Sequence, residues 1–145
     1  MFKKTLVGLL CCVSTATAAA WPKDMCPTGA DGLWVVVSTH PYSDITALSW
    51  DEAHAYIGKK VFVSDRKVIY AGVQCEVVKK SIENISKMPT FDPSLDVFDP
   101  KFPYSIGYGC RDNVFVFGFG IGRSCDRITS GGDGWTFDLR RVKTK

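Results

Sequence analysis

The side chains of this sequence that are best suited to chemistry are its cysteines and its two histidines, His40 and His54. A cysteine–histidine nucleophile needs a free thiol, and disulfides account better for the cysteines. A serine–histidine–aspartate triad could be assembled only from Ser38, His40 and Asp44, and no G-x-S-x-G nucleophile elbow accompanies these residues. The sequence therefore predicts a protein that is not an enzyme and has no catalytic residues.

A second candidate for chemistry is the glycine-rich run at residues 118–122, which superficially resembles a phosphate-binding loop. Such a loop binds phosphate because it leads into a helix N-terminus. This run instead lies among residues that favour β-strands, and no helical pattern follows it. We therefore predict no cofactor.

The cysteines offer a structural rather than a chemical role. A zinc site would need two closely spaced pairs, and no such pair lies beyond residue 20. An even number of cysteines in an exported domain indicates two disulfides, with three possible pairings. The four cysteines concerned are Cys26, Cys75, Cys110 and Cys125.

The first twenty residues have the order of a secretory signal peptide. Lys3 and Lys4 form a basic N-terminal region, and residues 5–13 form an apolar region. Small residues over 16–20 then provide a signal-peptidase cleavage region. We predict cleavage after Ala20, with Ala18 as the alternative. This places the protein in the periplasm or outside the cell. No second apolar stretch is long enough to span a bilayer.

Residues 21–145 have the length of one domain. Without Lys3 and Lys4, the chain carries 16 basic side chains (18 minus 2) and 15 acidic ones, a formal net charge of about +1. Nucleic-acid binding would favour a strongly basic stripe, so we predict no nucleic-acid partner.

The first half of the domain alternates strand and turn signals around one helix. Gly32–Val37 brings Trp34 and three valines together, which favours a buried strand. Ser49 and Glu52 form a capping box that predicts a helix over Trp50–Ile57. The strands expected after the helix are Val61–Val63, Val68–Tyr70 and Ala71–Val78.

The segment Ser81–Tyr104 contains four prolines and three phenylalanines. Proline removes a backbone donor and fixes φ, so this pattern predicts a long loop with one helical turn. Long loops in compact domains are often functional. We expect this one to act as a lid.

The last forty residues predict four strands, in which phenylalanines alternate with glycines. Adding them to the earlier strands gives about eight strands and one short helix. A closed antiparallel barrel of eight strands leaves no sheet edge and can hold one small ligand. The four strands are Ser105–Cys110, Val114–Ile121, Ser124–Thr129 and Trp135–Val142.

The order of the strands favours one disulfide pairing. Cys75 ends the first half of the strands and Cys110 lies after the long loop, so a bridge between them would close that loop. Cys26 precedes the first strand, which in a closed barrel neighbours the last strands. We therefore prefer Cys26–Cys125 as the second disulfide.

At the first strand, Gly32-Leu33-Trp34 is similar to the G-x-W signature of lipocalins and the wider calycin group. In that group, a basic residue from the last strand covers the tryptophan at the closed end of the barrel. Arg141 lies on the same face of its strand as Trp135, Phe137 and Leu139, so the resemblance implies that Arg141 covers Trp34. Both would be structural residues.

The chain also resembles small exported bacterial proteins with lipocalin-like folds, a family whose function is largely unassigned. The resemblance rests on Ile45–Ser49, the helix with Glu52-Ala53, Ile57-Gly58-Lys59, Gly72-x-x-Cys75, Cys110, Asp133-Gly134 and Leu139-x-Arg141. It implies a disulfide-bonded antiparallel lipocalin-like barrel over residues 21–145.

Two functions follow from these patterns. The first is a non-catalytic binding protein that holds a small apolar or amphipathic ligand in the barrel, beneath the Ser81–Tyr104 loop. The second is an inhibitor or immunity protein that blocks a periplasmic hydrolase, a peptidoglycan hydrolase or lipase, through that loop or through residues 40–44. The predicted ligand-binding residues are Tyr108, Phe115, Phe117, Phe119, Trp135 and Phe137.

Overall fold

The computed structural model describes residues 21–42, 44–87, 101–112 and 116–143. The predicted signal peptide at residues 1–20 lies outside the described residues. No helix within the described ranges has both the length and the apolar character needed to cross a membrane.

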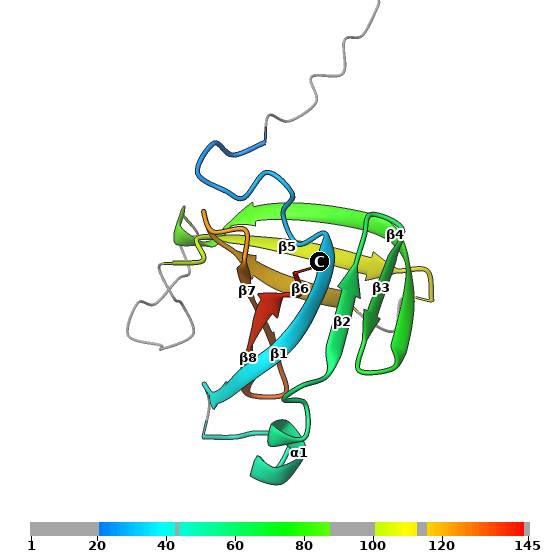
Figure 1. Cartoon of the computed structure of the whole chain (residues 1–145), viewed down its shortest axis with the longest axis vertical. Helices are drawn as coiled ribbons and strands as arrows, with labels where there is room; N and C mark the ends of the chain where they lie inside the picture. The colour runs from blue at the N-terminus through cyan, green and yellow to red at the C-terminus, as the bar shows by residue number, and fades with distance from the viewer. Residues whose placement is uncertain (1–20, 43, 88–100, 113–115, 144–145) are drawn as a thin grey trace, which may run out of the picture.

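The described chain forms a closed antiparallel β-barrel, as predicted (Figure 1). Each strand pairs with the next along the chain, and the last pairs with the first, so no edge is left open. The strands are β1 (Gly32–Pro41), β2 (Lys60–Val63), β3 (Lys67–Tyr70), β4 (Val73–Asn84), β5 (Tyr104–Cys110), β6 (Val116–Ile121), β7 (Arg127–Gly132) and β8 (Trp135–Arg141).

The helix α1 (Trp50–His54) begins where the capping box predicts but is shorter than expected. The Ser49 side chain accepts from the Glu52 backbone, and the Glu52 carboxylate accepts from the Ser49 backbone at 2.8 Å. The bonds that the Ser49 backbone and hydroxyl donate to this carboxylate lower the pKa of Glu52. The predicted end at Ile57 is wrong because Gly58 N–H donates to Val36 O at 2.8 Å. The chain must leave the helix early to rejoin β1.

Strand β4 differs most from its predicted bounds. It begins at Val73, because Ala71 and Gly72 both have positive φ and form the turn from β3. It ends at Asn84, since the register pairs Lys79 through Asn84 with β5. The predicted Ser81–Tyr104 loop therefore starts too early, and the short 3-10 helix η1 (Ile85–Lys87) follows the strand directly.

The turn between β7 and β8 is also tighter than predicted. Gly131 and Gly132 belong to β7, and only Asp133 and Gly134 turn the chain. Their φ values are +55° and +84°. Positive φ at both turn residues is the type I′ geometry, which Asp-Gly favours because its twist matches that of the flanking strands.

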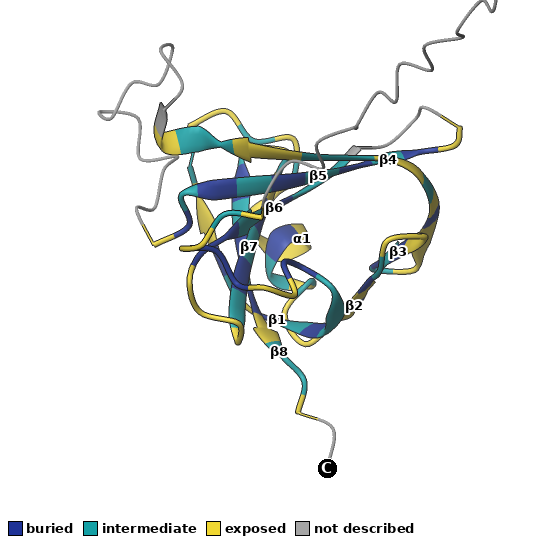
Figure 2. Ribbon diagram, turned by 90° about the horizontal axis from the view of Figure 1, so that it is seen from above, coloured by how far each residue is buried: buried dark blue, intermediate teal, exposed yellow. Residues whose placement is uncertain are grey.

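Buried residues alternate with less buried ones along most strands of the barrel, and together they form its core (Figure 2). In β5 the burial pattern alternates without a break from Tyr104 to Cys110. In β6, Phe119 and Ile121 are fully buried, while Gly118 and Gly120 alternate with them on the other face. The predicted separation of a bulky and a bare face is thus confirmed for this strand.

The two ends of the barrel are built differently (Figure 1). The capped end, at the top in Figure 1, carries residues 21–31 and the turn from β6 to β7. The cavity end carries α1, the turn from β3 to β4 and the turn from β7 to β8. Seen from above, α1 lies within the outline of the ring of strands (Figure 2).

Both predicted disulfides are confirmed. Cys26 bonds to Cys125, across 99 residues of sequence, and fastens the N-terminal segment to the turn before β7. Cys75 bonds to Cys110, across 35 residues, and joins β4 to β5. One bridge therefore holds each end of the barrel.

Candidate functional site

The interior of the barrel contains a cavity of about 240 Å³ at the cavity end. Its apolar walls come from strands β3, β4, β6 and β8 and from the segment that connects β1 to β2. The apolar lining residues are Leu48, Tyr56, Tyr70, Val73, Phe117 and Phe137. The remaining lining residues are Gly118, Ser130, Gly131, Gly132 and Asp133.

Four aromatic rings in this lining contact one another. Tyr70 and Phe117 stack nearly parallel, with 5.9 Å between centroids and 11° between planes. Tyr56 lies 5.1 Å from Phe137 and 6.3 Å from Tyr70. Rings at these separations attract one another through edges and offset faces, so the wall is held together before any ligand enters.

The hydroxyl of Tyr70 is a polar group in the apolar wall of the cavity. It shares a hydrogen bond of 2.9 Å with the hydroxyl of Ser130, sixty residues along the chain. Burial raises the pKa of Tyr70 to about 12, although the bond from Ser130 opposes this shift. Tyr70 therefore stays neutral at physiological pH and offers a hydrogen-bonding pair within an apolar wall.

Leu48 and Tyr56 reach the cavity because the β1–β2 connection is fastened to the β7–β8 turn. Ala47 N–H donates to Asp133 O, and Tyr42 N–H donates to Gly134 O, both at 3.0 Å. The indole of Trp135 donates to Leu48 O at 3.0 Å. The connection therefore forms a wall of the cavity with fixed backbone contacts.

The structure divides the predicted ligand-binding residues into three groups. Phe117 and Phe137 line the cavity. Phe119 and Trp135 are buried core residues outside the lining, at 0% and 2% exposure. Tyr108 is buried at the other end of the barrel, and Phe115 lies outside the described residues.

Tyr108 belongs to a polar cluster at the capped end. Its hydroxyl donates to Asp31 at 3.3 Å, and Lys80 lies 5.5 Å from its ring. Lys80 also pairs with Asp65. Burial raises the pKa of Tyr108 far above its usual value, and the Asp31 carboxylate adds to this effect. Burial also raises the pKa of Asp31, because its effect outweighs the opposing effect of the Lys80 charge.

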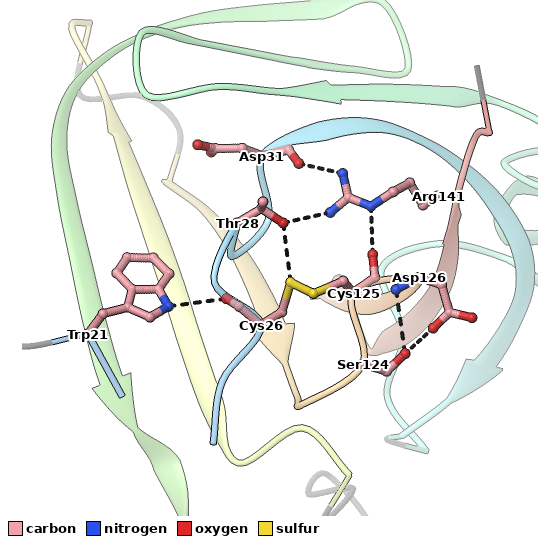
Figure 3. Close-up of a disulfide and its surroundings, with 8 residues drawn as sticks. All are labelled: Trp21, Cys26, Thr28, Asp31, Ser124, Cys125, Asp126 and Arg141. Atoms are coloured by element: carbon pink, nitrogen blue, oxygen red, sulfur yellow. Dashed lines mark hydrogen bonds between the residues drawn. A yellow bond between two sulfur atoms is a disulfide. The ribbon is translucent and has the colours of Figure 1, made fainter. Parts of the chain in front are cut away.

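The capped end is closed around Trp34. Its indole donates to Ala30 O at 2.7 Å, and the Arg141 guanidinium lies 4.3 Å from its ring centroid. Figure 3 shows Arg141 bonded to Asp31, Thr28 and Cys125 beside the disulfide. These contacts hold residues 26–31 over the barrel, so this end offers no entry to the cavity.

Gly32 is required at this end by the same arginine. Its φ is +138°, and a Cβ there would lie 2.3 Å from Arg141 Nη1. The spacing of the G-x-W pattern thus has a physical cause in this chain. Gly32 leaves room for the Arg141 guanidinium, and Trp34 provides the ring beneath it.

Comparisons with known proteins add no family to this description. No model of a protein family matches the chain, and no curated protein or solved structure matches it either. The fold and the cavity are therefore interpreted from the chain's own residues.

The suspected Ser38–His40–Asp44 group does not assemble as a triad. Ser38 donates to Asp138 Oδ2 at 2.7 Å, and His40 Nε2 lies 3.2 Å from the same oxygen. The carboxylate stands between serine and histidine, so His40 has no path to the Ser38 proton. Within the described residues, no group of three or more His, Cys, Asp or Glu side chains is placed to hold a metal.

The expected position of the Ser81–Tyr104 loop is wrong for its two described ends. Asn84 pairs with Tyr104 at the capped end, the opposite end from the cavity. Residues 88–100 lie outside the described residues. A surface hollow of about 470 Å³ next to these ends is lined by Lys101, Arg123 and Arg127, among others. It lies outside the barrel interior, since Arg127 neighbours the inward Ile128 along β7.

Sequence reasoning missed four lining residues that matter most: Tyr56, Tyr70, Ser130 and Asp133. Tyr70 had a detectable signal, because it alternates with buried Val68 on a predicted strand. Tyr56 and Asp133 lie in a connection and a turn, where no periodicity indicates which side chains face inward.

Proposed function

We propose that this protein is an exported, non-catalytic binding protein that holds a small apolar or amphipathic ligand inside a lipocalin-like barrel. The observation that carries the proposal is the cavity at the uncapped end. Its wall combines four aromatic rings with the hydroxyl pair of Tyr70 and Ser130. Apolar pockets with a few placed polar groups are typical of small-molecule sites.

The volume of the cavity limits the ligand. At about 240 Å³, it exceeds the roughly 150 Å³ cavity that accepts benzene in another protein. It falls below the roughly 300–1,000 Å³ of pockets for drug-sized ligands. A ligand with one ring or a short acyl chain suits this space.

Export is part of the proposal. The order of residues 1–20 is that of a secretory signal peptide. Two disulfides fit an oxidising compartment such as the periplasm or the extracellular space. An apolar compound that must cross an aqueous compartment would be a suitable cargo for such a carrier.

Gly132 allows a direct test, because a Cβ there meets nothing within 4 Å. Gly132 pairs with the inward Trp135, so Gly132→Leu should fill the cavity. Gly109→Leu is the control, because Gly109 lies at an outward position of β5 outside the cavity lining, and its Cβ would be 3.4 Å from Lys79 Cβ. Native mass spectrometry of exported protein should show an adduct in the wild type and in Gly109→Leu, and none in Gly132→Leu. An equal adduct in both variants would contradict the proposal.

A second candidate function is supported by exposed apolar side chains beside the cavity. Ile45 is 87% exposed and Trp50 is 59% exposed, both in the β1–β2 connection. This fits an inhibitor or immunity protein that contacts a periplasmic hydrolase with that connection. The double variant Ile45→Ser/Trp50→Ser should then lose inhibition of peptidoglycan hydrolases or lipases. Inhibition unchanged in this variant would contradict this candidate.

A further inference from the structure

The charge of the cavity wall distinguishes between classes of amphipathic ligand. Asp133 is the one residue with a formal charge among the eleven described residues that line the cavity. Its carbonyl accepts from Ala47 N–H at 3.0 Å, and its φ of +55° belongs to the tight turn. The carboxylate is therefore carried by a fixed backbone at the rim of the cavity.

The aromatic rings, like the Asp133 carboxylate, favour a positively charged ligand. The face of an aromatic ring carries negative electrostatic potential and attracts cations, most strongly where water is excluded. Tyr56 already shows this in the folded protein, because Lys59 Nζ lies 4.6 Å from its ring centroid. Several rings around one space form the arrangement that binds organic ammonium groups in aromatic cages.

An anionic ligand would meet the opposite environment. None of the described lining residues is a lysine or arginine, and the Tyr70 hydroxyl is already bonded to Ser130. Lys59 and Asp133 are both exposed, so water and salt screen both charges, but Lys59 is not among the lining residues and lies over the Tyr56 ring. A carboxylate or phosphate in the cavity would therefore lose hydration without gaining an ionic partner.

We propose that the cavity binds a small organic cation: a single aromatic ring or short alkyl group that carries an ammonium group. The apolar part would lie against Phe117 and Phe137, and the ammonium would lie towards Asp133. This inference rests on the proposed binding function and specifies its ligand class.

Three probes of similar size test the proposal on the full mature chain: 2-phenylethylamine, 2-phenylethanol and 3-phenylpropanoate, titrated by calorimetry. The amine should bind about tenfold tighter than the alcohol, because the rings and the carboxylate each add a few-fold. The carboxylate probe should bind most weakly.

Two variants locate the effect. Asp133→Asn keeps a residue that tolerates positive φ and should reduce the preference for the amine from about tenfold to about threefold, while leaving the alcohol's affinity unchanged. Gly132→Leu should abolish binding of both the amine and the alcohol. Thermal unfolding of each variant checks that the barrel remains folded.

The outcomes separate this inference from the binding function itself. Equal or tighter binding of the alcohol, lost in Gly132→Leu, would overturn the cation proposal and leave a carrier of neutral ligands. An unchanged amine preference in Asp133→Asn would overturn the role of the carboxylate. Failure of all three probes to bind would overturn the ligand class, while the native adduct would still decide the carrier function.

Discussion

The guanidinium of Arg141 lies 4.3 Å from the ring centroid of Trp34, and the two residues are register partners of strands β8 and β1. This contact closes the barrel at the seam where its last strand meets its first. The same guanidinium bonds to the backbone of Asp31 and of Cys125. One side chain thus joins the seam, the N-terminal segment and the disulfide-bearing turn.

The first prediction concerns this arginine. Arg141→Lys should lower the free energy of unfolding by about 2 kcal/mol, because lysine lacks the planar fork that bonds several acceptors while stacking on a ring. Arg140→Lys is the matched control, since Arg140 is exposed on the same strand. Urea unfolding followed by tryptophan fluorescence measures both. Equal losses in the two variants would show that Arg141 contributes only charge.

The second prediction concerns the order in which the disulfides are reduced. Cys125 is exposed, whereas Cys75 and Cys110 are only 3% and 2% exposed. Thiol exchange requires access to a sulfur, so mild reductant should open the Cys26–Cys125 bridge first. Alkylation followed by peptide mass spectrometry should label Cys26 and Cys125 before the other two.

Loss of that bridge has a second consequence. Its removal in a Cys26→Ser/Cys125→Ser variant should cost about 2–4 kcal/mol, since the bridge closes a long loop of the unfolded chain. The variant should keep the barrel's strand signal in circular dichroism at low temperature, because Cys75–Cys110 remains. Labelling of Cys75 and Cys110 in the wild type at the same rate as Cys26 and Cys125 would contradict the predicted order of reduction.

The third prediction concerns alkaline pH. The pKa of Tyr70 is raised to about 12 by burial, above the unfolded value of about 10. Between these two values the unfolded state binds fewer protons than the native state, so stability falls as pH rises. The contribution of Tyr70 to this fall should approach 1.4 kcal/mol per pH unit within the window.

Tyr70→Phe isolates this contribution from that of Tyr108, whose pKa is also raised. The variant should lose stability at pH 7, because the Ser130 hydroxyl loses its partner, yet its stability should decline less steeply above pH 10. Denaturant unfolding at pH 7, 9 and 11 measures the slopes. Parallel slopes in the wild type and Tyr70→Phe would contradict the prediction.

Much of the barrel could be predicted because its signals are local. Alternation over residues 104–110, the capping box at Ser49 and the presence of a turn within residues 131–134 each depend on neighbours in sequence. The disulfide pairing followed once the strand order was known. Strand ends were less predictable: β4 continues to Asn84 because β5 provides partners for it, and this information lies twenty residues away.

The cavity was predictable only in part. The sequence indicates that Phe117, Phe119 and Tyr108 face inward, and they do. It does not indicate which of these rings lines the cavity: Phe117 does, whereas the hydroxyl of Tyr108, its register partner on β5, reaches Asp31 at the capped end. That difference depends on what each side chain meets inside the barrel, which is set by strand pairing around the whole ring.

The last prediction tests the contact that holds the cavity wall in place. Gly72 and Gly134 have nearly equal φ values, +86° and +84°, so alanine is similarly strained at both. A Cβ at Gly72 meets nothing within 4 Å, whereas one at Gly134 would lie 2.8 Å from Ile45 O. Gly72→Ala should therefore cost about 1 kcal/mol from backbone strain alone.

Gly134→Ala should cost about 2–4 kcal/mol, because the strain is joined by a clash between the β7–β8 turn and the β1–β2 connection. The clash pushes apart the segments that place Leu48 and Asp133 in the cavity wall. Binding of any cavity ligand should weaken in Gly134→Ala and stay unchanged in Gly72→Ala. Equal unfolding free energies in the two variants would show that the connection is free to move away from the turn.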